Sequence, residues 1–580
     1  MKKLIGLVII FTFVSFGLTA QKKNFTVAPA VQKVLDEIRE FQTSEYKQDS
    51  AANHPLGSNT EEHFFNHYNF YSGINTALNT IDKNALSFDD QINLELLKYD
   101  IEEDISAYKY KSYFNPILAD EGFHTGLAYM GSNVFSSKED AKNYINRLKD
   151  IPRYVDENLT LMRKGLALGI DQPKAILDGY QNTYEQHIVA DATQSIFYKP
   201  FLKKSFTISD EDWQKITAEA KATVEQYAVA SFKKIKTFFD TEYLPKTRKT
   251  IGVSNFPDGL AYYQDRVHHY TTTDMTYEQV YQLGLSEVER IKKEMEGILK
   301  ELNYKGTMQQ FIEYLRTDPK FYCTTPEQLL KEASYICKKS DGMLSAFFSK
   351  LPRQPYGVEE VPAYLAPTYT AGRYSGASIR GKRAAHYWVN TYDLKSRPLY
   401  NLEALTMHES VPGHHLQISL AQELDNQPAF RRNLYVNVFG EGWGLYAEYL
   451  GTEMGFYKDP YSHFGRLTYE MWRACRLVLD VALHTKGWTR EQGVKYLADN
   501  TALSLHEVNT EINRYISWPG QALAYKLGEL KIKELRKRAE EKLGNKFDIR
   551  EFHDTVLSQG SVTLKVLEMM VDKYIAEKLK

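Results

Sequence analysis

Residues 408–415 read HESVPGHH and place three histidines and one glutamate within eight positions. The whole chain of 580 residues has only 15 histidines, so this segment is a sharp local excess. In the helical zinc motif H-E-x-x-H, two histidines one turn apart bind the metal and the glutamate acts as general base. Here position 412 is proline instead of histidine. The segment therefore indicates either a zinc site of altered spacing or a helix end that happens to be rich in histidine.

The spacing of these histidines requires a break in the helix. A straight helix would place His414 about 120° around the axis from His408, and His415 about 10.5 Å further along it. With metal–nitrogen bonds of about 2.1 Å, neither pair could then bind one ion. Pro412 cannot donate to the carbonyl of His408 and its ring clashes with that carbonyl, while Gly413 tolerates most backbone angles. We predict a bulge or break that brings a second histidine back toward His408.

A catalytic zinc site also needs a third protein ligand and an open position for water. The best candidate lies in FGEGWGLYAEYL, residues 439–450. Glu441 has glycines on both sides, and such small residues let one helix approach another closely. Glu448 lies two turns further along the same face. It could accept a hydrogen bond from the ring nitrogen of a ligand histidine that does not bind the metal, and so fix the tautomer of that histidine. We expect Glu441 to be the ligand, the alternative being an ordinary helix with two solvated glutamates.

The rest of the chain has the periodicity of a helical protein. Apolar residues recur at spacings of three and four at 138–166, 209–241, 276–303, 325–350, 463–486 and 529–542. Shorter extended patterns occur at 361–367 and 386–391, ahead of the histidine-rich segment. A strand there would allow an extended peptide to pair by strand addition. We predict a mostly α fold, a single large helical domain over residues 21–580, with a small β element.

The chain begins with the pattern of a secretory signal peptide. A basic start, MKK, precedes an apolar run over residues 4–18, and Thr19-Ala20 form a small-residue exit. We predict cleavage after Ala20, so that residues 1–20 are removed and the mature chain is exported, periplasmic or secreted. A membrane anchor is the alternative, but the polar Thr12, Ser15 and Thr19 and the polar continuation favour cleavage. No cysteine lies near Ala20, so we expect no lipid anchor. No later stretch approaches the length of an apolar span, so we expect no membrane span after cleavage.

Composition restricts the partners and the cross-links. The chain has 72 basic and 74 acidic residues, and this balance argues against nucleic acid as a partner. Three cysteines are too few for a disulfide framework. Cys323 and Cys337 could pair in an oxidising compartment, which would leave Cys475 free.

Three runs of sequence, taken in order, resemble one bacterial family. They read HYWVNTYDL…NLEALTMHESVPGHHLQ, then GEGWGLYAE, then RYISWPGQALAYKLG. The family is catalogued as domain of unknown function 885, and the resemblance spans most of the mature chain. That family is similar in turn to helical gluzincin metallopeptidases such as carboxypeptidase Taq, thimet oligopeptidase and angiotensin-converting enzyme. Those enzymes carry H-E-x-G-H or close variants, whereas this chain has two additional residues within the motif.

The resemblance implies a gluzincin-type helical fold and a zinc-dependent peptidase that holds one Zn²⁺ per chain. It implies that His408 and His414 are zinc ligands, Glu441 the third ligand and Glu409 the general base. His415 remains the rival of His414 because of the insertion. In this chemistry the metal lowers the pKa of water toward about 7, and Glu409 takes the proton as the water attacks a peptide carbonyl.

In the related peptidases a Tyr or His from a later helix stabilises the developing oxyanion. Tyr525 in GQALAYKLG is our leading candidate for this catalytic role, and Tyr515 in NRYISW is a second candidate that could contact substrate. The chain has 41 tyrosines, so neither position is distinctive. His484, four residues after Asp480, could support the metal site or the oxyanion, or could form a buried pair with Asp480 that holds two helices.

Arginines near these motifs are candidates for binding a substrate carboxylate, which an exopeptidase would need. They are Arg514, Arg373 and Arg380. Both trimming of chain ends and internal cleavage are compatible with them. The alternative function is a catalytically inactive peptide-binding protein on a metallopeptidase scaffold. The retained Glu409 favours the enzyme, because a binding role needs no general base.

Overall fold

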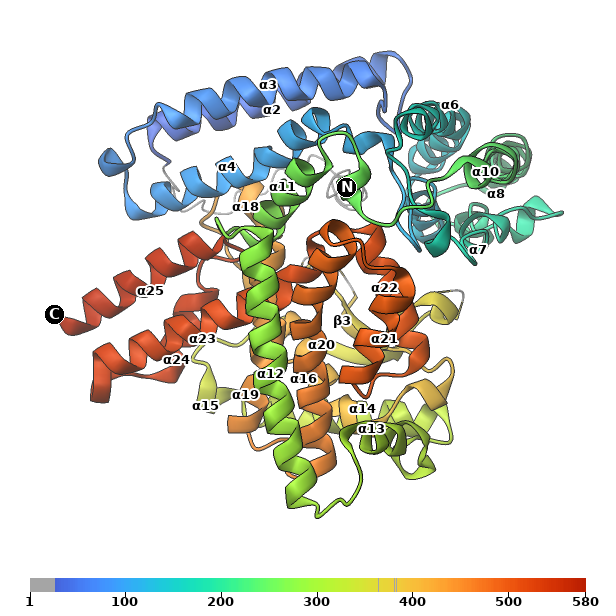
Figure 1. Ribbon diagram of the computed structural model, residues 1–580. Coiled ribbons are helices and arrows are strands. Elements are labelled where there is room, and N and C mark those ends of the chain that lie inside the picture. The colour runs from blue at the N-terminus through green and yellow to red at the C-terminus, as the bar shows by residue number, and fades with distance from the viewer. Residues whose placement is uncertain (1–26, 364, 380, 382) are drawn as a thin grey trace. The chain divides into compact units, whose positions relative to one another are not determined.

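The computed structural model describes residues 27–363, 365–379, 381 and 383–580, so the predicted signal peptide lies outside the described residues. Helices dominate, accompanied by one three-stranded sheet (Figure 1). The predicted mostly α class with a small β element is thus confirmed. Among the described helices, none is both long enough and apolar enough to cross a bilayer.

The contacts of the chain group it into two compact units. One comprises the residues up to Ile251 together with Asn255–Gly259, and the other comprises Gly252–Ser254 and Leu260–Lys580. The division falls at residues 252–259, which read GVSNFPDG and contain two glycines, one serine and one proline. This joint is short and no low-complexity linker accompanies it, which is why the sequence predicts one domain over residues 21–580. The histidine-rich segment and every other predicted site residue belong to the second unit.

The first unit begins with three long helices, α2 (Pro29–Ala51), α3 (Glu61–Asn79) and α4 (Phe88–Lys109), which contact one another. Thr60 and Ser87 cap α3 and α4, each hydroxyl accepting a backbone N–H of the first turn. The later helices are α5 (Thr125–Ala128), α6 (Lys138–Leu168), α7 (Asn182–Glu185), α8 (Asp210–Thr223), α9 (Ala230–Phe238) and α10 (Leu244–Lys246). The helical predictions at 138–166 and 209–241 are confirmed, the second with π-helical turns at Val224–Val229 and Phe239–Tyr243.

The second unit is organised around α20 (Pro460–Thr485), which is buried at almost every position from Ser462 to His484. It packs against α12 (Tyr277–Glu301), while α19 (Asn437–Glu453) packs against α23 (Ala524–Leu543). The helices predicted at 276–303, 463–486 and 529–542 are therefore present. The others are α11 (Gly259–Thr271), α13 (Met308–Thr317), α14 (Pro326–Asp341), α15 (Leu344–Phe347), α16 (Leu402–Glu409), α17 (His414–Gln422), α18 (Ala429–Asn433), α21 (Arg490–Asn500), α22 (Leu505–Ser517), α24 (Ile549–Leu557) and α25 (Leu564–Leu579).

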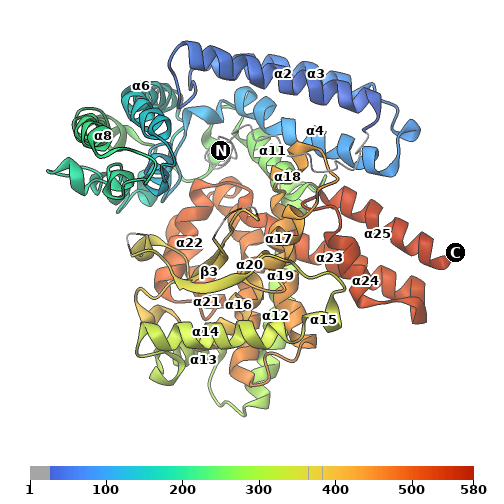
Figure 2. The same cartoon turned by 180° about the vertical axis from the view of Figure 1, so that it is seen from behind.

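The sheet has the strand order β1-β3-β2, with β1 (Tyr356–Glu360) parallel and β2 (Gly372–Ser375) antiparallel to β3 (Ala385–Val389). It lies beside α14 and α16, which contact β1 and β2 respectively (Figure 2). The order leaves β2 at an edge of the sheet, next to the helix that carries His408. The small β element therefore lies where the sequence predicts it, directly beside the histidine motif.

Two local predictions differ from the structure. The extended pattern at 386–391 falls on β3, but the one at 361–367 is wrong, because β1 ends at Glu360 and Ala366–Thr368 form a 3-10 turn. Pro362 and Pro367 lack the N–H that a strand ladder needs. The helix predicted at 325–350 is also interrupted, since α14 ends at Asp341 and Gly342 caps it.

All three cysteines are free. Cys337 is buried in α14 and Cys323 is half-buried ahead of it, so the disulfide considered between them is not formed. Burial raises the pKa of the Cys337 thiol to about 11, which keeps it protonated and unreactive near neutral pH.

Candidate metal centre

The histidine motif is split between two helices. α16 ends at Glu409 and α17 begins at His414, so the predicted break is present. The intervening loop is anchored on both sides: Ser340 Oγ donates to the carbonyl of Val411 and Trp443 Nε1 to that of Pro412, each over 2.8 Å. The peptide bond between Val411 and Pro412 is cis. The break lets the two histidines approach from different directions, which a straight helix could not achieve.

His408, His414 and Glu441 offer ligand atoms that lie within 4.8 Å of one another. Glu441 Oε2 is 3.6 Å from His408 Nε2 and 3.5 Å from His414 Nε2. The two rings are nearly perpendicular, at 88°, with centroids 4.7 Å apart. Ligands about 2.1 Å from a tetrahedral ion are about 3.4 Å from each other, so this spacing fits a zinc-like ion. The three residues that the sequence nominates as ligands are therefore brought together.

Glycines in α19 allow this convergence. A Cβ at Gly444 would lie 2.6 Å from Cε1 of His408, and one at Gly442 would lie 2.5 Å from Cα of Gly528 in α23. Real Cβ atoms do not approach other atoms so closely, so α16 and α23 can reach α19 only because these positions lack side chains. The glycines around Glu441 thus mark close approach on two sides of the helix.

Glu448 supports His408 from behind. Its Oε1 is 2.8 Å from His408 Nδ1 and 3.2 Å from Nη2 of Arg473 in α20. A carboxylate only accepts, so Nδ1 of His408 carries a proton, and Nε2, on the side of Glu441, is the nitrogen that would bind a metal. Hydrogen bonding from a carboxylate to the far nitrogen of a ligand histidine is a recurrent feature of metal sites. Glu448 therefore takes the supporting role that the sequence left open to it, and Glu441 the central one.

The cluster has the charge of a cation site. Burial lowers the pKa of His408, but hydrogen bonds to Glu441 and Glu448 and the charge of Glu409 outweigh it and raise the pKa to about 10. Burial raises the pKa of Glu441, yet hydrogen bonds from His408 and His414 hold it well below its usual range. The carboxylates of Glu441, Glu448 and Glu409 thus favour positive charge at His408. A divalent ion would replace the proton on its Nε2 and satisfy the same carboxylates, so the residues fit a metal.

Glu409 is positioned by the sheet. Its side chain is buried, and its Oε2 accepts the backbone N–H of Tyr374 in β2 over 2.7 Å. Glu409 directly follows His408, and its charge contributes to the raised pKa of that histidine. The residue nominated as general base is therefore held beside the cluster by the edge strand of the sheet.

His415 faces away from the cluster. Its Nε2 is 3.1 Å from the carbonyl of Gln354, and its Nδ1 is 3.3 Å from both Tyr374 Oη and Ser419 Oγ. Burial lowers the pKa of His415 to about 4, so it is neutral. Of the two rival histidines, the structure thus brings His414 to Glu441 and uses His415 to hold the sheet against α17.

Tyr525 lies near His408 and is hydrogen-bonded to Arg514. The ring of Tyr525 is stacked toward that of His408, with centroids 6.4 Å apart. Its hydroxyl accepts from Arg514 Nη2 over 3.1 Å, and the same nitrogen donates to Gln521 over 2.7 Å. Tyr525 is therefore close to the cluster with an oriented hydroxyl, as its predicted role requires.

Tyr515 is not placed to contact a substrate. It is 1% exposed, and its hydroxyl accepts from Trp472 Nε1 over 2.7 Å and from Arg476 Nε over 2.9 Å. The sequence could not reveal this, because a buried and an exposed tyrosine on an amphipathic helix look alike. Its role is to join α22 to α20.

The other predicted residues fall into separate places. Arg373 is exposed on β2, and its charge reaches Tyr435 near the cluster, while Arg380 lies outside the described residues. Asp480 and His484 do not form a pair. Asp480 accepts from Tyr263 and Gly520, and His484 binds the N–H of Val253 and the carbonyl of Tyr515. Their contacts are structural.

Sequence reasoning missed two contributors. Tyr435 Oη donates to Glu441 Oε1 over 3.2 Å, and burial and the charge of Glu441 raise its pKa well above the usual range. No signal distinguishes this tyrosine from the others. Arg473 did have one: charged residues recur every three or four positions along the otherwise apolar α20, which predicts buried ion pairs.

The fold and the cluster together define a mostly helical protein with a His-His-Glu candidate metal centre beside a small sheet. The chain belongs to the family described as bacterial protein of unknown function (DUF885), whose model matches residues 40–571. This confirms the family resemblance drawn from the sequence motifs. A comparison with curated proteins gave no match.

Two solved structures are similar to this chain. One, from Colwellia psychrerythraea, is described as a "putative lipoprotein"; it is 28% identical, with a TM-score of 0.84 over 94% of this chain and 99% of that one. Another, from Shewanella oneidensis, is described as a "putative lipoprotein of unknown function"; it is 17% identical, with a TM-score of 0.68 over 93% of this chain and 98% of that one. The second similarity concerns the fold alone.

Proposed function

We propose that the protein is an exported zinc-dependent metallohydrolase that cleaves peptides. The observation that carries the proposal is the convergence of His408 Nε2, His414 Nε2 and Glu441 Oε2 beside the buried carboxylate of Glu409. Two histidines and one glutamate are the ligand set of several catalytic zinc sites, and three protein ligands leave a position open. A purely structural zinc site would have four protein ligands and no need of a carboxylate base.

The metal, Glu409 and the Tyr374 N–H have different roles in the proposed reaction. When bound, zinc supplies Lewis acidity that makes water acidic near neutral pH and polarises a substrate carbonyl. Glu409 accepts the proton of the attacking water and later returns it to the leaving amine. The N–H of Tyr374 orients one carboxylate oxygen of Glu409, which leaves the other oxygen for the proton.

Tyr525 is the better placed of two tyrosines to stabilise the oxyanion. Its hydroxyl accepts from Arg514, so its own proton remains available for donation. The hydroxyl of Tyr435 already donates its proton to Glu441 in a hydrogen bond, so it is not available to an oxyanion. Loss of one oxyanion donor typically costs about 10²–10³ in kcat. Tyr525 is therefore assigned to the transition state and Tyr435 to holding the ligand.

A peptide is the substrate class that the surroundings favour. β2 is an edge strand that contacts α16, and an edge strand offers backbone groups to an extended chain. Arg373 on the exposed face of β2 and Arg514 beside Tyr525 are cations that suit a substrate carboxylate. Export rests on the signal-peptide pattern of residues 1–20, and it agrees with similarity to proteins described as lipoproteins.

The deciding experiment is Glu409→Gln, assayed with a mixed peptide library alongside metal analysis. Glutamine keeps the side-chain shape and can still accept from Tyr374, but it is a poor proton acceptor. The variant should retain zinc and cleave about 10²–10⁴ times more slowly than wild type. Glu327→Gln, at an exposed position of α14 (76% exposed), is the matched control and should behave as wild type.

Equal rates for Glu409→Gln and wild type would remove Glu409 from the role of base. If neither protein cleaves any peptide but both bind them, the chain is a peptide-binding protein on a metallopeptidase scaffold. If wild type holds no metal, the centre itself is misassigned.

A further inference from the structure

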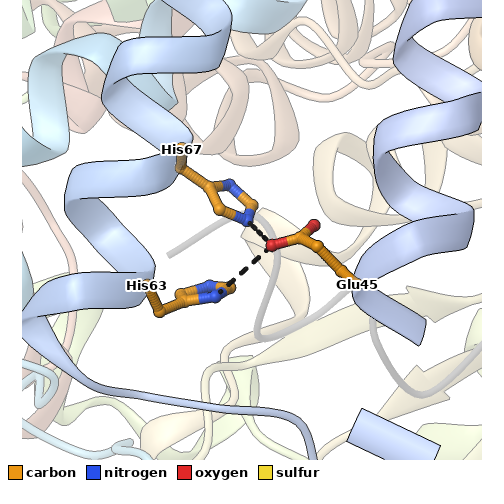
Figure 3. A group of neighbouring side chains, drawn as sticks. All are labelled: Glu45, His63 and His67. Carbon is orange, nitrogen blue, oxygen red and sulfur yellow. Dashed lines mark hydrogen bonds and ion pairs between the residues drawn. The ribbon is translucent and has the colours of Figure 1, made fainter. Parts of the chain in front are cut away.

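A second cluster of metal-binding side chains lies in the first unit, and it shares no residue with the centre described above. It comprises Glu45 on α2 and His63 and His67 on α3 (Figure 3). His63 and His67 are one helical turn apart, so they project from the same face of α3. Glu45 reaches toward both rings from the neighbouring helix, as Figure 3 shows.

The distances suit a shared ion. Glu45 Oε1 is 2.6 Å from His67 Nε2 and 3.5 Å from His63 Nδ1, and the two ring centroids are 4.2 Å apart. One ligand atom from each residue lies within 4.8 Å of the others. A small outward rotation of Glu45 would bring its oxygen from 2.6 Å toward the separation of about 3.4 Å from His67 Nε2 that a tetrahedral ion requires, and its distance from His63 Nδ1 is already 3.5 Å. The two histidines need no movement of the backbone, because i, i+4 spacing on an intact helix already presents both rings.

His67 has a second carboxylate behind it. Its Nδ1 is 3.0 Å from Oδ1 of Asp104 on α4, which is 13% exposed. This repeats the relationship between Glu448 and His408: a carboxylate fixes the proton on Nδ1 and directs the Nε2 lone pair to the shared point. An ion pair between one histidine and one carboxylate would not require this second, half-buried acceptor together with another histidine on the same turn.

Accessibility fits a site that loads from solvent. The side chain of His67 is 8% exposed, whereas those of His63 and Glu45 are 28% and 26% exposed. The buried ligand anchors the site and the other two border the surface. Thr60 accepts the backbone N–H of His63 and so fixes the first turn of α3, which leaves the two ligands on α3 in a set position.

We propose that Glu45, His63 and His67 form a second binding site for a divalent transition metal such as zinc, which ties α2 to α3. Two imidazoles and one carboxylate suit zinc, cobalt or nickel, whereas calcium and magnesium prefer oxygen ligands alone. The site is independent of the proposed peptidase activity, because it uses other residues in the other unit.

The test counts zinc in a chain whose first centre has been disabled. His414→Ala removes one ligand of that centre, and the remaining zinc is titrated against a chromophoric chelator. One equivalent should remain in His414→Ala and be lost when His63→Ala is added. His54→Ala, which changes a histidine of the same unit outside the cluster, should retain the equivalent.

Cobalt provides a second readout. Cobalt bound to His414→Ala should give visible d–d absorption, and adding Glu45→Gln should abolish it. Asp104→Asn leaves every ligand in place and should weaken zinc binding about 10–100-fold. Far-UV circular dichroism of each metal-free variant distinguishes lost binding from lost folding.

The proposal is overturned if folded His414→Ala binds the same amount of zinc with and without His63→Ala. It is equally overturned if His414→Ala binds none, in which case the cluster is an ion-pair network between α2 and α3. Neither result depends on whether wild type cleaves peptides, so the proposed function stands or falls separately.

Discussion

Gly444 lies so close to His408 that a Cβ at this position would sit 2.6 Å from the imidazole carbon Cε1. The position of His408, a candidate metal ligand on α16, thus depends on the absence of a side chain on a different helix, α19. This relationship makes a glycine of α19 as important to the centre as a ligand.

Gly444→Ala should weaken zinc binding at the first centre although it removes no ligand. The added methyl overlaps the His408 ring, and overpacking typically costs about 1–3 kcal/mol, which corresponds to about 5–150-fold in affinity where the cost falls on metal binding. Gly297→Ala in α12 is the control, because a Cβ there meets no atom within 4 Å; it should stabilise the protein by about 0.5–1 kcal/mol. Chelator competition on both variants measures the effect, and unchanged affinity in Gly444→Ala would contradict it.

Glu448→Gln should reduce zinc affinity about 10–100-fold without touching a ligand. The glutamine amide would face either His408 Nδ1 or Arg473, and both of those groups need an acceptor. Glu453→Gln on the same helix, whose carboxylate pairs with Arg536 near the surface, is the matched control. Equal affinity in the two variants would show that Glu448 does not orient His408.

Tyr525→Phe and Tyr515→Phe should separate catalysis from stability. The first removes the proposed oxyanion donor, so kcat should fall about 10²–10³-fold, while Arg514 keeps its bond to Gln521 and stability changes little. The second leaves Trp472 Nε1 and Arg476 Nε short of an acceptor, which should cost about 1–3 kcal/mol in the free energy of unfolding. Turnover at saturating peptide measures the first effect and urea denaturation the second. A loss of stability in Tyr525→Phe together with a loss of kcat in Tyr515→Phe would contradict these assignments.

Asp480→Asn should change how stability depends on pH. Burial raises the pKa of Asp480 to about 7, against the hydrogen bonds from Tyr263 and Gly520 and the charge of Arg476, which lower it. The folded state therefore binds this proton more tightly than the unfolded chain. The stabilisation is fully present below the unfolded pKa of about 3.9 and is lost as the pH rises through about 7.

Between pH 4 and pH 8, the free energy of unfolding of Asp480→Asn should gain about 3–4 kcal/mol relative to wild type. Denaturation across this range measures the difference. The exposed Asp499→Asn should give a profile parallel to wild type, since its carboxylate pairs with Lys495 at the surface. A parallel profile for Asp480→Asn would mean that Asp480 is ionised in the folded protein throughout.

The sequence predicts which residue types form the centre better than it predicts which side chains point into it. Pro412 and Gly413 predict a break in the helix, because the missing N–H of proline and the missing Cβ of glycine act on the local backbone. Whether His414 or His415 then faces Glu441 depends on Gln354, which is distant in sequence and accepts from His415. A choice set by a remote partner cannot be obtained from the motif alone.

The sequence predicts the helices well, but it does not predict the roles of individual buried polar residues. Apolar spacing on α12 and α20 reports which face is buried, and that face is a local property. The role of Tyr515 or Tyr435 depends on which donor or acceptor arrives from another helix. The boundary between the two units falls at the Gly- and Pro-containing segment 252–259. Short segments of this composition also form turns within one domain, so the segment alone does not identify a boundary.

The hydrogen bond from the Tyr374 N–H to Glu409 changes what the edge of β2 can offer to the peptide that we propose as substrate. In an antiparallel strand the N–H and carbonyl of one residue point to the same side, so the Tyr374 carbonyl faces the outer edge beside an amide that is already committed. A chain laid along this edge would meet an acceptor at Tyr374 but no donor. A proline or an N-methylated residue at that register would lack the N–H for this bond. If the proposed peptide substrate lies along β2, we therefore expect N-alkylated peptides to bind less tightly.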